Sequence, residues 1–175
     1  MKAMIPEGSI VQPGAGRVIA GLGALAKVSA GTFDGRVFIF EGTIEPGAFI
    51  PPHTHTHEDE VSMVLSGAMT VDVGGQLWTA EPGALVVKPR GVHHSMWNHT
   101  DVPTRVLEVF TPGRLEPYFD ALGELFSARG VEEVERQRAI IELHTKYGII
   151  YHPELVPEVV AADGRRPHLV VPGGS

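Results

Sequence analysis

The chain has 175 residues, with 14 lysines and arginines against 21 aspartates and glutamates, a formal net charge of −7 and no cysteine. This length fits one globular domain that buries its own core. The acidic balance argues against a nucleic acid or an anionic membrane as a partner, because both are bound through clustered cations. Without cysteine, disulfides, thiolate metal sites, iron–sulfur clusters and a cysteine nucleophile are all excluded.

The N-terminal region does not read as a targeting or membrane segment. No apolar run approaches the roughly 18 residues needed to cross a bilayer. The most apolar stretch, residues 18–26, is interrupted by glycines and preceded by Glu7, which is unlike a secretory signal. We therefore expect a cytoplasmic protein.

Between residues 36 and 111 the sequence alternates between short β-branched or aromatic runs and turn residues. Short, regularly spaced runs of this kind predict an all-β sandwich or barrel. The pair Gly74-Gly75 suits a two-residue hairpin turn, since glycine adopts positive φ without strain. The expected strands are 36–44, 60–67, 69–73, 76–80, 84–88, 93–98 and 104–110.

After residue 113 the pattern becomes helical. Apolar residues recur at three- and four-residue spacing over 115–126, and Gly130 ends this segment. A second helix is expected over 131–147, with glutamates in its first turn and Gly148 just beyond its end. We expect a single domain, 1–175, made of a barrel at about 30–111, a helical segment at about 114–148 and an irregular tail at 153–175.

The residues that carry chemistry gather in the predicted barrel. His53 and His55 are two residues apart on a segment that should be extended, so both imidazoles project to the same face. Glu60 follows on the next strand, and His94 supplies a further imidazole. A carboxylate that faces imidazoles at one end of a β pocket can bind a divalent metal ion.

Residues 47–98 resemble the paired motifs of the cupin superfamily. The first motif reads glycine, five residues, His53-x-His55, four residues, Glu60, six residues, glycine. The second reads glycine, five residues, Pro-x-Gly, two residues, His94, three residues, Asn98. The resemblance implies an all-β double-stranded β-helix, or jelly-roll barrel, followed here by C-terminal α-helices. It also implies one divalent metal ion held by His53, His55, Glu60 and His94.

The segment 105–119 passes from a strand through Thr-Pro-Gly into an aromatic helix. It is similar to the small single-domain cupins grouped with quercetin 2,3-dioxygenase. This likeness implies a metal-dependent dioxygenase whose small-molecule substrate is an oxygenated, aromatic or enolisable compound. Glu60 would then also be catalytic, as a general base that leaves the metal. The ligand types suit Fe, Mn, Ni, Cu, Co or Zn, and the sequence does not choose among them.

Two alternatives stay open. The first is a non-oxidative cupin isomerase, lyase or cyclase, in which the ion polarises a carbonyl. The second is a non-catalytic module that binds a metal or a small ligand. Consumption of O₂ during turnover would distinguish the dioxygenase from the first. Loss of metal binding in His94→Ala without loss of any turnover would favour the second.

Other polar residues of the region have weaker assignments. His57 continues the alternation of His53 and His55, but the strand should end before it. His93 should face away from His94, and His99 follows the end of the second motif, so both are expected at the surface or behind the ligands. Glu108 is the one other acid inside an expected strand, either beside the site or facing solvent.

The N-terminal residues predict that two copies of the chain associate. Small cupins often pair through N-terminal strands, and residues 1–35 contain enough β-branched positions for a strand that adds to a partner's sheet edge. Those positions are Ile5, Ile10, Val11, Val18 and Ile19. We therefore expect a homodimer. The helical segment could instead cover the barrel mouth and limit the size of the substrate.

Overall fold

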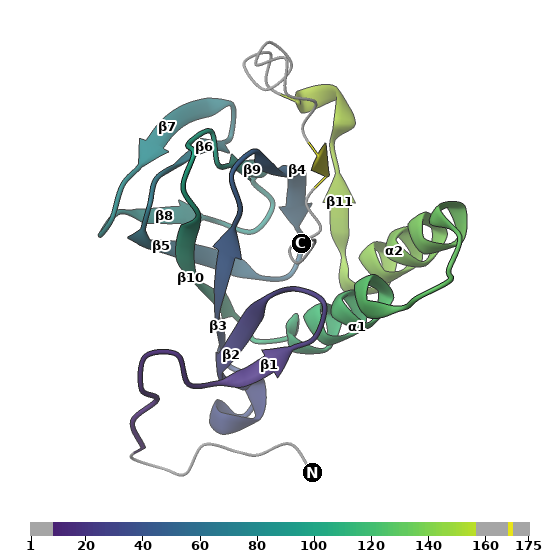
Figure 1. The fold of residues 1–175 in the computed structure, drawn as a ribbon, viewed down its shortest axis with the longest axis horizontal. Coiled ribbons are helices and arrows are strands. Elements are labelled where there is room, and N and C mark those ends of the chain that lie inside the picture. Colours follow the sequence, from purple (N-terminus) through teal and green to yellow (C-terminus); the bar gives the residue numbers. More distant parts are fainter. Residues whose placement is uncertain (1–8, 157–167, 170–175) are drawn as a thin grey trace.

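The computed structural model describes residues 9–156 and 168–169. Their strands form two sheets that face each other, with the helices beside them (Figure 1). Sheet A contains, in order across the sheet, β1 (Arg17–Ile19), β2 (Ala24–Val28), β3 (Phe38–Ile44), β10 (Thr104–Thr111), β5 (Asp59–Ser66) and β8 (Leu85–Lys88). Sheet B contains β11 (Ile149–Tyr151), β4 (Ala48–His55), β9 (His94–Trp97), β6 (Met69–Val73) and β7 (Gln76–Ala80). The predicted fold class is confirmed.

The seven strands expected between residues 36 and 110 lie within two residues of their predicted positions, because side chains in a strand alternate between two faces. β4 was not among them, although the segment around His53 and His55 was expected to be extended. In β3 the alternate residues Phe38, Phe40 and Ile44 are buried inside the barrel. The hairpin between β6 and β7 turns at Gly74 and Gly75, whose φ angles are 64° and 85°. The glycine pair therefore acts as the sequence predicted.

Two helices follow the barrel. They are α1 (Glu116–Ser127) and α2 (Glu133–Tyr147), and α2 ends at Gly148 with a φ of 69°. The apolar stripe of α1 packs through Tyr118 and Phe119 onto an aromatic cluster with Phe38 and Phe110. The helices thus pack against one apolar cluster of the barrel, and a second apolar cluster includes Val64 and Met96.

The N-terminal strands are used within the chain itself. β1 pairs with β2, and β2 pairs with β3, so these residues extend sheet A of their own molecule. A short 3-10 helix, η1 (Ala30–Phe33), connects β2 to β3. Ile5, which we expected to contribute to a dimer, lies outside the described residues. The homodimer itself remains a prediction.

In the described part of the chain, three short regular elements follow α2, and two of them fall within the tail, 153–175, that the sequence indicated to be irregular. The strand β11 follows α2 directly, and a 3-10 helix, η2 (Pro153–Leu155), comes after it. Within the predicted tail, β12 (His168–Leu169) pairs in parallel with Ala48 and Phe49 of β4, so the prediction is wrong at this point. Both β11 and β12 pair with β4, and the sequence of β4 does not predict either pairing. Among the described helices, none is long and apolar enough to cross a membrane.

Candidate metal centre

The barrel brings the four predicted ligand residues together. His53 and His55 lie on β4, His94 lies opposite His53 on the paired strand β9, and Glu60 reaches them from β5 in the other sheet. All four side chains are buried, and one ligand atom from each lies within 4.8 Å of the others. Three imidazoles from sheet B therefore face one carboxylate from sheet A.

Backbone carbonyls orient two of the three imidazoles. His53 Nδ1 lies 2.8 Å from the carbonyl oxygen of Pro51, and His94 Nδ1 lies 3.2 Å from that of Val92. A carbonyl can only accept a hydrogen bond, so each Nδ1 carries the proton and each Nε2 keeps a free lone pair. Carbonyl contacts of this kind are the usual way in which metal-binding histidines are held.

The carboxylate of Glu60 points one oxygen at the histidines. Glu60 Oε2 lies 3.0 Å from His55 Nε2 and 3.1 Å from His94 Nε2. Glu60 Oε2 and His94 Nε2 are nevertheless buried polar atoms without a hydrogen-bond partner. Buried polar atoms are costly to leave unpaired, and a divalent cation would satisfy both. The donor set of three nitrogens and one oxygen thus fits a transition metal ion.

Burial sets the protonation of these groups. It holds the pKa of His53 well below its usual value, and the neighbouring imidazoles of His94 and His55 act in the same direction. Burial also lowers the pKa of His94. Both imidazoles are therefore neutral, the form that binds metals. For Glu60 burial opposes ionisation, but the charge of Lys88 and the contacts with His55 and His94 hold its pKa well below the usual range.

A buried polar group lies directly behind Glu60. Lys88, at the end of β8, forms an ion pair with Glu60 Oε1, and its Nζ lies 3.4 Å from Glu108 Oε2. Glu108 also accepts a hydrogen bond of 2.5 Å from Ser62 Oγ. Burial raises the pKa of Glu108 to about 7, although Lys88 opposes this shift. Burial alone would lower the pKa of Lys88, yet the carboxylates of Glu108 and Glu60 raise it above its usual value.

Lys88 is the residue of the site that the sequence analysis missed. The register places Lys88 opposite Glu60, and Val86 opposite Ser62, so the inward face of β8 carries Val86 and Lys88. Leu85 and Val87 point outward instead and are 64% and 61% exposed. β8 alternates between its two faces, but both faces carry apolar residues, with Val86 on one and Leu85 and Val87 on the other. The alternation along the strand therefore could not show which face points into the barrel.

The other histidines of the region, His57, His93 and His99, lie outside the cluster. His57 is exposed beyond the end of β4, and His99 is exposed with its ring 2.8 Å from Thr70 Oγ1, so neither joins the cluster. His93 packs its ring 6.2 Å from that of His152, on the side away from His94. Glu108 is buried inside the barrel, as one of its two interpretations held.

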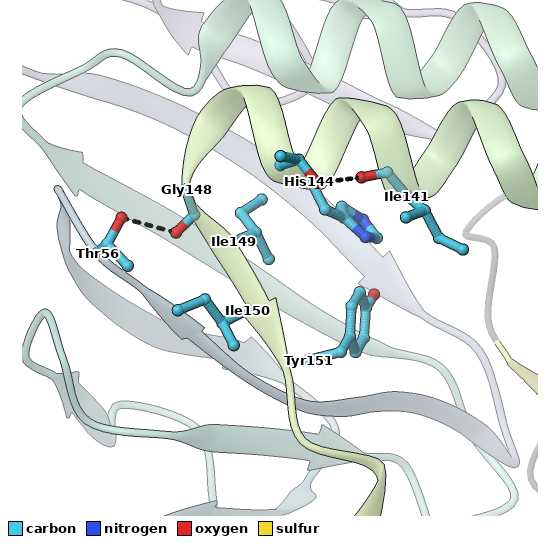
Figure 2. A pocket seen from close by; sticks show the side chains of 8 residues that line it. Thr56, Ile141, His144, Gly148, Ile149, Ile150 and Tyr151 are labelled. Carbon is cyan, nitrogen blue, oxygen red and sulfur yellow. Dashed lines mark hydrogen bonds between the residues drawn. The ribbon is translucent and has the colours of Figure 1, made fainter.

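The C-terminal strand β11 covers the outer edge of β4 beside the site. Ile149 pairs with His55 and Tyr151 pairs with His53, whose ring lies 6.0 Å from that of Tyr151. Between α2 and β11 runs a mostly apolar cleft of about 430 Å³, which Figure 2 shows with His144 and Tyr151 facing each other. None of the four ligand residues lines this cleft.

Comparison with known proteins agrees with this geometry. Residues 40–110, which hold all four ligand positions, match the family model of the cupin domain. This barrel is a cupin. The matched residues contain both sequence motifs and contribute strands to both sheets.

Among curated proteins the cupin resembles plant germin-like proteins over a short region. It is 39% identical over 72 residues to germin-like protein 5-1 of Oryza sativa subsp. japonica, covering 37% of this chain and 32% of that protein. It is 40% identical over 73 residues to germin-like protein subfamily 2 member 1 of Arabidopsis thaliana, with the same two coverages. The chain therefore spans about a third of the length of the curated relatives it matches.

Solved structures with a similar barrel have low sequence identity. KdgF from Halomonas sp. aligns with a TM-score of 0.47 and 22% identity, over 53% of this chain and 82% of that one. A predicted oxalate decarboxylase from Thermotoga maritima aligns with a TM-score of 0.49 and 19% identity, over 51% and 78% of the two chains.

Proposed function

We propose that this cupin binds one divalent transition metal ion through His53, His55, Glu60 and His94. The observation that carries the proposal is the buried cluster itself, in which two imidazoles are fixed by carbonyls with their Nε2 lone pairs free. Fe, Mn, Ni, Cu, Co and Zn all accept such a donor set, so the identity of the ion is left to measurement.

We further propose that the protein is a metal-dependent dioxygenase of a small oxygenated compound, aromatic or enolisable and quercetinase-like. When bound, the ion would supply Lewis-acid polarisation of a substrate oxygen. All four ligand side chains are buried, and His53 is the most exposed of them at 9%. The ring of Phe110 lies 5.8 Å from that of His55 and is itself buried, so it gives this imidazole an apolar neighbour.

Glu60 has two roles in this proposal. As a ligand it contributes Oε2, which has no hydrogen-bond partner of its own. As a general base it would accept a proton from the substrate, for which it must give up its contacts with His55 and His94. Lys88 keeps the pKa of Glu60 low, which makes the carboxylate a weak base, so we give the ligand role the greater weight.

The first experiment tests the metal. Untagged protein is analysed for bound metals, stripped with a chelator and titrated with Mn(II), Fe(II) and Zn(II). We expect one ion per chain, and a loss of at least a hundredfold in affinity in His94→Ala, because one of four ligands is removed. His99→Ala is the matched control, since this histidine is exposed and outside the cluster. A wild-type protein that takes up no ion would refute the proposal.

The second experiment tests the reaction. The loaded protein is mixed with flavonols, catechols and β-diketones while dissolved O₂ is recorded. Uptake of one O₂ per substrate consumed, lost in His94→Ala and kept in His99→Ala, would support the dioxygenase. Turnover without O₂ uptake would favour an isomerase, lyase or cyclase. Tight metal binding with no turnover of any probe would favour a binding module.

A further inference from the structure

Lys88 is a buried cation that contacts a metal ligand from behind. It ends the edge strand β8 of sheet A, yet its side chain is fully buried, because the register of β8 on β5 turns it inward opposite Glu60. Its Nζ contacts Glu60 Oε1, Glu108 Oε2 at 3.4 Å and Met96 Sδ at 3.5 Å. Glu60 is thus held at both ends, with Oε1 on Lys88 and Oε2 among the histidines.

The charges at the site explain why such a residue is needed. Glu60 is 4% exposed, and the Nδ1 atoms of His53 and His94 are directed at backbone carbonyls rather than at its carboxylate. Among the described residues, Lys88 is the only lysine or arginine paired with Glu60. An unpaired buried carboxylate would be strongly destabilising, so the ion pair supports the closed barrel in the absence of metal.

The same charge acts against an incoming ion. A divalent cation bound to Oε2 would share one carboxylate with the ammonium group on Oε1, and like charges at such short range in a buried site repel each other. Glu108 offsets part of this repulsion from its place on the far side of Lys88. Lys88 therefore has opposite effects on the metal-free and the metal-bound protein.

We propose that Lys88 is a positioning residue that serves as the built-in counter-cation of Glu60. It keeps the metal-free site folded, with Oε2 directed at the histidines, and it lowers the affinity for the ion in exchange. The second half of this proposal rests on the proposed metal binding. The first half concerns the metal-free chain alone and can be tested without any ion.

The test uses Lys88→Met, which keeps the length of the side chain and removes its charge. In the metal-free protein we expect the melting temperature to fall by about 10 °C, as for loss of one partner of a buried ion pair. With saturating Zn(II) the fall should be less than half as large. The dissociation constant for Zn(II), measured by chelator competition, should become at least tenfold tighter. Lys88→Arg, which keeps the charge, should stay within threefold of the wild-type constant.

A matched control separates charge from packing. Val86→Ala removes a buried side chain from the inward face of the same strand and should lower both melting temperatures equally, with an unchanged dissociation constant. If Lys88→Met behaves in this way, or weakens the binding of Zn(II), the proposal is overturned.

A double-mutant cycle in metal-free protein completes the test. In a Glu60→Gln background Lys88 keeps only Glu108 as a charged partner, so Lys88→Met should cost less than half of what it costs in the wild type. If Lys88→Met alone does not fold, a folded Lys88→Met/Glu60→Gln protein supports the proposal and an unfolded one overturns it. Absence of Mn(II), Fe(II) and Zn(II) binding by wild-type protein would refute the proposed function, whereas an additive cycle would refute the counter-cation.

Discussion

His144 is a buried histidine that takes no part in the metal centre. It lies on the inner face of α2, 5% exposed, with Nε2 at 3.1 Å from the hydroxyl of Tyr118 and its ring 4.6 Å from that of Tyr151. Burial lowers the pKa of His144 from 6.5 to about 4. The folded protein therefore keeps this imidazole neutral over a range in which the unfolded chain protonates it.

This difference predicts a pH dependence of stability. Above pH 6.5 both states are neutral at His144, and the full stability is present. As the pH falls from 6.5 to about 4, the unfolded state binds a proton that the folded state does not, and the free energy of unfolding decreases by about 2 kcal/mol. Urea denaturation of metal-free protein at several pH values measures this loss. His144→Phe should flatten the curve in that range, and an equally steep curve would contradict the assignment.

The ligand residues could be predicted from the sequence because a strand has a period of two. His53 and His55 share a face for that reason, and the spacing to Glu60 leaves room for one turn between β4 and β5. Lys88 could not be predicted, since its strand is apolar on both faces and only the pairing with Glu60 decides which face is inside. The position of Lys88 thus depends on how β8 pairs with β5, a contact between residues distant in sequence, and not on the local sequence pattern.

At the scale of elements, α1 is positioned by the close approach of two glycines. A Cβ added to Gly123 would lie 1.9 Å from the carbonyl oxygen of Ala20, and one added to Gly21 would lie 2.3 Å from the carbonyl oxygen of Gly123. The turn between β1 and β2 thus rests directly on the backbone of the helix. Glycine is unfavourable inside a helix by about 1 kcal/mol, so its presence in α1 reflects this packing.

The contact predicts an effect opposite in sign to helix propensity. Gly123→Ala should destabilise the protein by about 2 kcal/mol, because the backbone of Ala20 cannot yield as a flexible side chain would. Thermal or urea unfolding measures the change. Gly31→Ala is the control, since its Cβ would meet nothing within 4 Å, and we expect a change below about 0.5 kcal/mol. A stabilised Gly123→Ala protein would show that α1 does not rest on the turn.

Element prediction succeeded where a segment carries its own periodicity. The barrel strands and both helices fall into this class, since apolar alternation and the apolar stripe of α1 are local properties of the chain. The strands β11 and β12 do not, because a short segment becomes a strand only when an open edge is available to pair with. That edge is β4, which lies about a hundred residues earlier in the sequence.

At the scale of the whole molecule, part of the outer face of sheet A is apolar across β8, β5 and β10. Leu85 and Val87 on β8 are 64% and 61% exposed, and Met63 on β5 is 37% exposed. Cross-strand pairing continues this surface in two rows. One runs through Leu85, Met63 and Leu107 and ends at the charged Glu41 of β3, and the other runs through Val87, Val61, Val109 and Ile39. A continuous apolar sheet face of this kind is rarely left in water.

We propose that a second copy of the chain covers this face, which is a different dimer surface from the N-terminal strands that the sequence indicated. Two flat sheet faces of the same sequence can pack on each other about a two-fold axis. Light scattering should give the mass of a dimer for the wild type and that of a monomer for Leu85→Lys/Val87→Lys. Leu77→Lys, at an exposed apolar position of sheet B, should remain dimeric. A wild-type mass of one chain would contradict the prediction.

The ion pair between Lys88 and Glu60 also bears on how the protein would acquire its metal. The four ligand residues come from both sheets and meet only when the barrel has closed. A barrel that closes around Lys88, as proposed, would complete its folding before any ion arrives, and folding and metal uptake would then be separate events. The ion would then bind to an already folded site, and its identity would depend on which divalent ions are available in solution at that time. The same chain produced in media of different metal content would accordingly carry different ions in the same fold.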